Sequence, residues 1–320
     1  MSVRKSGRAG TKPRKARPDG GVNPRQPCPC GSGRRYKSCH GSSAGPVEVA
    51  VTRPFDGLAA ECELVALREF VPSATAPLAL AIDTEREITL ATVLPMAAAA
   101  LVRTDGRAFV GLQVQTKSSD VSRDVARAVR WVLEAEPGDV LPVVGPDTDA
   151  GENPERLQDL LDTGATVEPE LHSDFGWWMP EDADTGGDVA ASLERANAAI
   201  LPTERVGPAA YWVDAGDKAH LRWVRPEPEE RLLPALARLS ARGELGLGDN
   251  TRFAGSFRAH GLLVPVWDLD PEAHAREWAD PAADLGKRLD EALASLDSEP
   301  LNADERRARD GLIGRQVTIR

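Results

Sequence analysis

The chain has 320 residues, enough for a tail plus one large domain or two small ones. Its net charge of −11 is divided unevenly, because residues 1–41 hold eleven Lys and Arg against one Asp, which leaves 28 basic and 49 acidic residues beyond them. No apolar stretch follows the basic start, and the longest apolar run, residues 96–102, is too short for a bilayer, so we expect a cytoplasmic protein with no secretory signal and no membrane span.

Residues 1–26 combine Gly, Pro, Arg and Lys without hydrophobic periodicity, which predicts a disordered basic tail. A basic tail on an acidic body suggests contact with a polyanion such as RNA. A solvated tail without a partner is the alternative. Arginine outnumbers lysine by 32 to 7, as in proteins of GC-rich genomes, so the arginine content alone does not argue for nucleic-acid binding.

The next segment contains three cysteines and a histidine: Cys28 and Cys30 lie one residue apart, and Cys39 and His40 close the set. Four such ligands within thirteen residues suit a closed tetrahedral zinc site, which has no position for water and is therefore structural. A segment this short has almost no apolar core, so its folding should depend on the metal. A disulfide pair and a phosphate-binding loop are the alternatives, but the chain resembles an intracellular protein and lacks the spacing of a P-loop.

This segment, residues 27–43, resembles the SEC-C zinc motif, which occurs at the C-terminus of the SecA translocation ATPase and in many other bacterial proteins. The resemblance implies one zinc ion, ligated by Cys28, Cys30, Cys39 and His40. It also implies docking on a partner such as the SecB chaperone or the ribosome. The matching residues are Cys28, Cys30, Gly31, Ser32, Gly33, Tyr36, Lys37, Cys39, His40 and Gly41.

A linker at residues 42–45 leads to the body, which we expect from about residue 50. Cys62, the fourth cysteine, lies among apolar neighbours and is expected in the core. Alternating apolar residues predict strands, and the Thr104-Asp105-Gly106 turn predicts a hairpin. The strands are expected at residues 88–94, 100–102 and 109–114.

Three helices are expected in the same part of the chain. The first is capped by Ser119 or Asp120, ends at Pro137-Gly138, and has an apolar face of Val121, Val125, Val129 and Val132. The second opens at Asn153-Pro154 and buries Leu157, Leu160 and Leu161. The third starts near Asp188, with one apolar side of Val189, Leu193 and Ile200.

Strands and helices also alternate beyond residue 205. Strands are expected at residues 211–213 and 220–224, and a hairpin of strands 251–258 and 262–269 turns at His260-Gly261. A helix through Leu232, Leu236 and Leu239 should have Pro234 near its first turn or a kink there. A further helix opens at Asp280-Pro281 and has an apolar face of Leu285, Leu289, Leu293 and Leu296.

The last residues predict a helix and a strand. Asn302 is a suitable helix cap and Glu305 completes a capping box, while Gly311 and Gly314 should stop the helix. Residues 316–319 alternate enough to add a strand that buries Val317 and Ile319. The predicted class is therefore α+β, with mixed or antiparallel sheets and packed helices. The expected organisation is a disordered basic tail at residues 1–26, a zinc knuckle at 27–43 and an acidic body at 50–320. The body could consist of two halves, 50–205 and 206–320.

The body also resembles an actinobacterial family of unknown function that carries this knuckle at its N-terminus. The resemblance covers most of residues 50–320 and implies a GC-rich Gram-positive origin, but no activity. The stretches that carry it are Arg53 to Leu58, Leu67 to Pro72, Gly255 to Leu269 and Ala303 to Arg320.

His172 and Asp174 are the best candidates for chemistry in the body, because a His and a carboxylate two residues apart could orient a base or bind a metal. No second ligand or nucleophile motif accompanies them, so surface hydrogen bonding is the preferred interpretation. His260 is interpreted as a turn residue, and His274 is expected to stack on Trp278.

The tryptophans are numerous for a chain with two tyrosines, and they could line a groove for peptide or bases. Core positions are the preferred interpretation. The residues concerned are Trp177, Trp178, Trp212, Trp223 and Trp267.

Two functions remain open from the sequence. The first is a zinc-binding, non-catalytic adaptor, whose knuckle and basic tail dock on a ribosome or a secretion chaperone. The second is an enzyme of unknown reaction, for example a hydrolase, with its site in the body and the knuckle as a targeting tag. No catalytic or cofactor-binding residue other than the zinc ligands is assigned.

Overall fold

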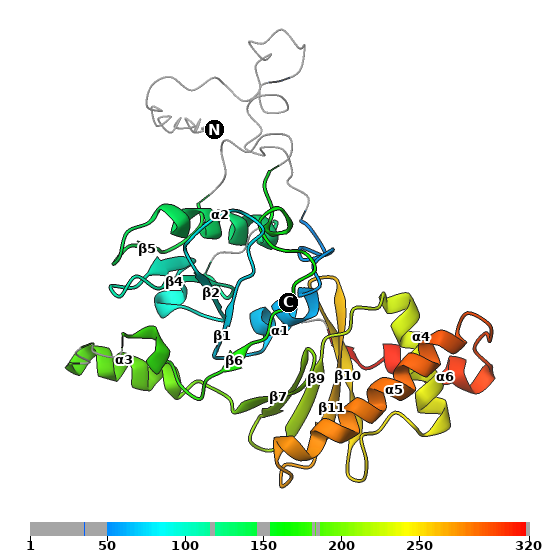
Figure 1. Ribbon diagram of the computed structural model, residues 1–320. Coiled ribbons are helices and arrows are strands. Elements are labelled where there is room, and N and C mark those ends of the chain that lie inside the picture. Colours follow the sequence, from blue (N-terminus) through cyan, green and yellow to red (C-terminus); the bar gives the residue numbers. More distant parts are fainter. Residues whose placement is uncertain are drawn as a thin grey trace, which may run out of the picture. The chain divides into compact units, whose positions relative to one another are not determined.

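The computed structural model divides the chain into two units, Met1–Val49 and Ala50–Arg320. The structure describes residue 35 and, in the second unit, residues 50–115, 119–145, 154–180, 183 and 186–317 (Figure 1). The predictions for the tail, for the zinc ligands and for residues 318–320 lie outside these residues.

The first sheet of the second unit has the strand order β5-β3-β4-β2-β1-β6. β2 and β4 pair in parallel and the other neighbours are antiparallel, so the sheet is mixed. The predicted hairpin is confirmed: β3 and β4 flank a turn in which Gly106 has a φ of 87°. The strands are β1 (Ala74–Pro77), β2 (Ile88–Ala91), β3 (Ala100–Val102), β4 (Ala108–Gly111), β5 (Val140–Leu141) and β6 (Glu170–Leu171).

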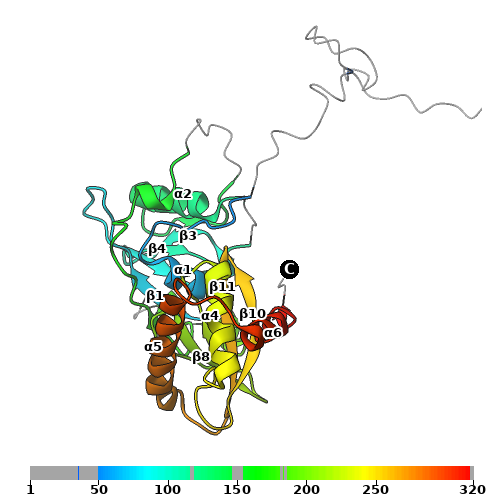
Figure 2. The same ribbon diagram turned by 90° about the vertical axis from the view of Figure 1, so that its right-hand side faces the viewer.

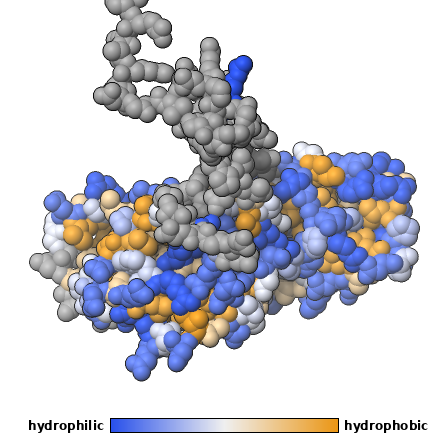
Figure 3. All heavy atoms as spheres, turned by 90° about the horizontal axis from the view of Figure 1, so that it is seen from above, coloured by the Kyte–Doolittle hydropathy of each residue, from blue (hydrophilic) through white to orange (hydrophobic). Residues whose placement is uncertain are grey.

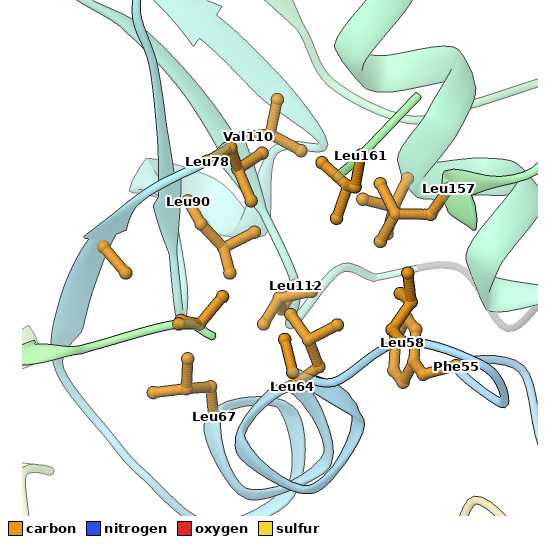
Figure 4. Packing of buried hydrophobic residues seen from close by; sticks show 14 of the residues in the cluster. Phe55, Leu58, Leu64, Leu67, Leu78, Leu90, Val110, Leu112, Leu157 and Leu161 are labelled. Carbon is orange, nitrogen blue, oxygen red and sulfur yellow. The ribbon is translucent and has the colours of Figure 1, made fainter. Parts of the chain in front are cut away.

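Two helices bury their apolar residues against this sheet. In α2 (Val121–Glu134), the predicted cap is confirmed, because the Asp120 side chain accepts the N–H of Ser122. The predicted apolar face is buried at Val125, Val129 and Val132, while Val121 is half-buried. The other helix, α1 (Glu61–Glu69), was not predicted, and Figure 4 shows its Leu64 and Leu67 among the leucines of the first sheet.

The second sheet has the order β12-β10-β11-β9-β8-β7 and is antiparallel except for the parallel pair β10 and β12. The turn between β10 and β11 is tight because His260 and Gly261 both have positive φ, 47° and 79°, as a two-residue hairpin loop requires. The strands are β7 (Thr203–Gly207), β8 (Ala210–Asp214), β9 (Ala219–Trp223), β10 (Arg252–Ala259), β11 (Leu262–Leu269) and β12 (Gln316–Val317).

Helices α4 (Glu229–Arg242), α5 (Ala279–Ser295) and α6 (Ala303–Ile313) lie on one side of this sheet (Figure 2). They enclose a second buried cluster, in which Trp267 is fully buried and donates its Nε1–H to the Leu245 carbonyl at 2.8 Å. The predicted capping box of Asn302 and Glu305 is confirmed at the start of α6. The class is α+β, as predicted.

Several elements differ from the prediction. The helix expected from Asn153-Pro154 is a single 3-10 turn, Leu157–Asp159, although its three leucines are buried as expected. Gly311 lies within α6, which Gly314 ends, and Pro234 lies in the second turn of α4. The third helix, α3 (Gly187–Asn197), forms where expected, but it contributes no buried residue. The predicted C-terminal strand forms as β12, whereas the side chain of Val317 is not described.

The two sheets share one hydrophobic core. The cluster that contains Leu64, from α1, and Leu90, from β2, also contains Tyr211, Leu262 and Val264 of the second sheet. Figure 1 accordingly shows α1 between the two sheets. The edge strands β6 and β7 approach one another, and the ion pair between Glu168 and Arg205 links their surroundings.

Candidate functional site

The zinc ligands predicted at Cys28, Cys30, Cys39 and His40 lie outside the described residues, so the site stays a prediction. Three thiolates and an imidazole are a donor set that zinc prefers. In the part of the chain that the structure describes, no group of three or more His, Cys, Asp or Glu side chains is placed to hold a metal ion.

His172 and Asp174 do not act on one another in the structure. The Nε2 of His172 lies 2.8 Å from the Oγ1 of Thr75 on β1, because β1 and β6 pair side by side. The Oδ1 of Asp174 accepts the N–H of Gly176 at 2.7 Å and so closes the turn before Trp177. The geometry therefore matches the hydrogen-bonding interpretation of both residues.

Two hollows meet at His172. One, of about 520 Å³, lies between the end of β6 and the strand β7, and its apolar lining includes Leu171, Ile200 and Trp212. The other, of about 480 Å³, lies along β1 and includes Trp177. The first hollow has apolar walls and a few polar groups, which is the usual form of small-molecule sites, so it is the candidate ligand site of the body.

The hydroxyl of Thr75 and the imidazole of His172 are within reach of a proton transfer, as in a nucleophile and base pair. The described residues provide no partner for the other ring nitrogen of His172, whereas such a base is normally oriented by a third group. The neighbouring Ser73 hydroxyl is already hydrogen-bonded on both sides, since it donates to the Asp174 carbonyl and accepts the Nε1–H of Trp177. The arrangement can bind and orient a ligand by hydrogen bonds.

The tryptophans divide between the core and this site. Trp223 and Trp267 are buried, as the preferred interpretation expected. Trp177 is half-buried and its ring centroid lies 5.6 Å from that of His172, while Trp178 stacks on Phe175 at 4.3 Å. Aromatic rings therefore form one wall beside His172.

A buried carboxylate, which no sequence pattern indicates, joins the two sheets near these hollows. Glu63 of α1 accepts the hydroxyl of Tyr211 and an N–H of Arg205, both at 2.6 Å, and the N–H of Ala209 at 2.9 Å. Burial, followed by the charge of Glu63, raises the pKa of Tyr211. No local motif marks this network, because Glu63 lies more than 140 residues before each of its partners in the sequence.

Two other histidines, His260 and His274, have structural roles. His260 lies at the hairpin tip, as predicted, and its Nε2 is 2.8 Å from the Oε1 of Glu69. The expected stacking of His274 on Trp278 is wrong. His274 instead caps the 3-10 turn Ala275–Trp278 by accepting the N–H of Arg276.

Cys62 is half-buried against the first core rather than fully enclosed. Burial, with the charges of Glu61 and Glu227, raises the pKa of its thiol to about 12. Because the thiolate is the nucleophile, we expect alkylation of Cys62 at pH 8 to be about 1,000-fold slower in the folded protein than after denaturation. Iodoacetamide labelling followed by peptide mass spectrometry measures both rates, and equal rates would contradict the expectation.

Hydrophilic and hydrophobic residues are mixed on the described surface seen from above, where the orange areas are small and separated (Figure 3). No helix within the described residues combines the length and the hydropathy that crossing a membrane requires.

Comparison with known proteins gave two matches to family models. The SEC-C motif matches residues 25–42, which include the four predicted zinc ligands. A search of curated proteins and a search of solved structures each found no match. The second family model matches residues 54–320, and by this match the chain belongs to a family of unknown function, DUF5926.

Proposed function

We propose that the protein is a zinc-binding, non-catalytic adaptor of the cytoplasm. A zinc knuckle at residues 27–43, ligated by Cys28, Cys30, Cys39 and His40, would dock on a ribosome or a secretion chaperone. The basic tail at residues 1–26 would add contacts to RNA. Docking would bring the body at residues 50–320 to that ribosome or chaperone.

The SEC-C match is the observation that carries this proposal. The match covers residues 25–42, the stretch that contains the four proposed ligands. The resemblance to the motif at the end of the SecA translocation ATPase implies docking on a chaperone or ribosome. The charge distribution supports it, because eleven of the 39 basic residues lie within the first 41 positions. A concentrated basic segment attracts phosphate-rich partners.

We expect the full chain to co-sediment with ribosomes at low salt and to dissociate as salt rises. Phosphate contacts release counterions, so the logarithm of the binding constant should fall steeply and linearly with that of the salt concentration. Deletion of residues 1–41 should abolish co-sedimentation. Ultracentrifugation through a sucrose cushion, at about 50 to 200 mM salt, measures the bound fraction.

The matched control is a variant with Cys30→Ser and Cys39→Ser, which leaves every basic residue in place. Loss of binding in this variant would assign docking to the knuckle, whereas loss only on removal of Arg14, Lys15 and Arg17 would assign it to the tail. Undiminished sedimentation of the chain without residues 1–41 would contradict the proposal, because ribosome binding would then lie in the body.

A further inference from the structure

One face of the second sheet carries a cluster of charged residues that the proposed function does not use. Leu221 and Trp223 of β9 face the helices, so the alternate residues His220 and Arg222 lie on the opposite face. Asp268 of β11 lies directly opposite His220 on the same face.

Asp268 is the centre of this cluster. Its Oδ2 lies 2.6 Å from a guanidinium nitrogen of Arg252 and 3.2 Å from the Nζ of Lys218, and its Oδ1 lies 3.3 Å from the Nδ1 of His220. The cations are accessible, because the side chains of Arg252 and Lys218 are 70% and 54% exposed. One carboxylate is thus shared between two exposed cations.

Arg222 adds a third cation that has no carboxylate. Among the described residues it forms no hydrogen bond or ion pair, and its guanidinium lies over the ring of Phe70, 5.8 Å from the centroid. Burial alone lowers its pKa, with no acidic group acting in the opposite direction. A half-buried guanidinium without a partner has lost hydration that a bound anion would replace.

The cations outnumber the acids on this face, and their spacing excludes a single small anion. Lys218, His220 and Arg222 follow one another at every second position, so about 13 Å of strand separates Lys218 from Arg222. Arg252 lies two strands away from His220, or about 10 Å across the sheet. A phosphate group can contact one or two of these side chains, whereas a chain of phosphates can contact all of them.

We propose that the part of this face around Asp268, beyond the residues buried in the shared core, binds single-stranded RNA, with Lys218, Arg222 and Arg252 contacting successive phosphates. Val266 is half-buried on the same face, and half-buried Phe70, at the end of α1, packs over that face against Phe257. They provide an apolar surface beside the cations, where unpaired bases can pack. The site is separate in sequence from the knuckle and the basic tail, and it does not require that either of them docks.

The test uses the full chain and a fluorescein-labelled oligouridylate of about 20 nucleotides, with anisotropy measured across a salt series. The triple variant Lys218→Gln, Arg222→Gln, Arg252→Gln should raise Kd at least about tenfold and reduce the slope of log K against log salt by about 2, at about 0.7 per lost phosphate contact. A double variant, Lys218→Gln with Arg252→Gln, preserves the Phe70 contact and carries the test if the triple variant is less stable.

The matched control replaces Arg130, Arg231 and Arg307 by Gln. These arginines lie on helices and are each paired with an acidic residue, so the control removes the same total charge from elsewhere in the body. This control should bind as the unchanged protein does. An equal loss of affinity in control and triple variant would overturn the proposal, because the effect would then be one of net charge. Unchanged Kd in the triple and double variants, with loss only on substitution of Arg14, Lys15 and Arg17, would also overturn it and would leave the docking proposal intact.

Discussion

Arg238→Ala is expected to lower the free energy of unfolding by about 3–5 kcal/mol. Arg238 and Glu305 form an ion pair at 3.1 Å between α4 and α6, and their side chains are only 1% and 5% exposed. Arg238 also donates to the carbonyl of Glu299 at 2.7 Å. Its removal leaves a carboxylate and a carbonyl buried without their main partner, which is the costly case for a buried pair.

Urea unfolding followed by tryptophan fluorescence measures this loss, and two comparisons interpret it. Arg238→Met with Glu305→Leu removes both charges and should recover much of the stability. Arg307→Ala breaks an exposed ion pair with Asp304 and should cost less than about 1 kcal/mol. If Arg238→Ala lost less than about 1 kcal/mol, while the slope of unfolding free energy against urea concentration stayed unchanged, the result would contradict the burial of the pair.

The same pair predicts a pH dependence. Burial opposes ionisation of Glu305, but the N–H of Asn302 and then Arg238 overcome it and lower the pKa of the carboxyl. A lowered folded-state pKa gives stability that is present above the unfolded pKa of about 4.3 and is lost as the pH falls through the folded value. The difference in stability between the unchanged protein and the double Met and Leu variant should therefore shift below pH 4.3, in favour of the double variant.

Protein purified without added zinc should contain about one zinc ion per chain, and Cys30→Ser with Cys39→Ser should abolish it. Thiolates supply most of the ligand set, and two ligands of four cannot close a tetrahedral site. Inductively coupled plasma mass spectrometry against protein concentration gives the ratio. Chelation at low pH should release the metal, since protonated thiols and imidazole do not bind it.

Cys62→Ser is the matched control for the zinc measurement, because it removes a cysteine of the body and should leave the ratio unchanged. Zinc retained after both knuckle substitutions would contradict the proposed ligands. Metal-free protein whose spectra and protease sensitivity in residues 27–43 equal those of the zinc form would contradict a structural role for the metal.

The features that local sequence determines were predicted correctly. Asp120 and Asn302 cap α2 and α6 because their side chains reach backbone N–H groups two or three residues ahead, which depends on few neighbours. The hairpin of β10 and β11 turns at His260-Gly261 because glycine accepts the positive φ of the second loop position. The apolar face of α2 was evident in the sequence because the opposite face is polar and solvated, which makes the helical period of the apolar residues clear.

Elements determined by packing were not predictable in this way. α1 is buried at six of its nine residues, including Glu61 and Glu63, so it has no polar face that would reveal a helical period. The residues from Pro154 to Leu161 have leucines at helical spacing, yet Gln158 donates to the carbonyls of Pro54 and Asp56, and only one 3-10 turn forms. These contacts lie about 100 residues away in the sequence.

The candidate site was predictable only in part, for the same reason. His172 was identified, but its partner is Thr75, 97 residues earlier, rather than Asp174 beside it. The pairing of β1 with β6 brings Thr75 and His172 together, and no pattern within either strand specifies that register. The cluster around Asp268 likewise depends on the order of three strands.

The shared core has a consequence for how the chain folds. Glu63 of α1 and its partner Tyr211 are 148 residues apart, and Leu64 packs in the same cluster as Val264. To form contacts between such distant residues, the chain must close large loops, and the entropy lost in closing them slows folding. Synthesis proceeds from the N-terminus, so the apolar residues of α1 emerge long before the strands that cover them. The first sheet therefore stays incompletely packed until the second sheet has been translated. During that time its apolar residues can aggregate or bind chaperones.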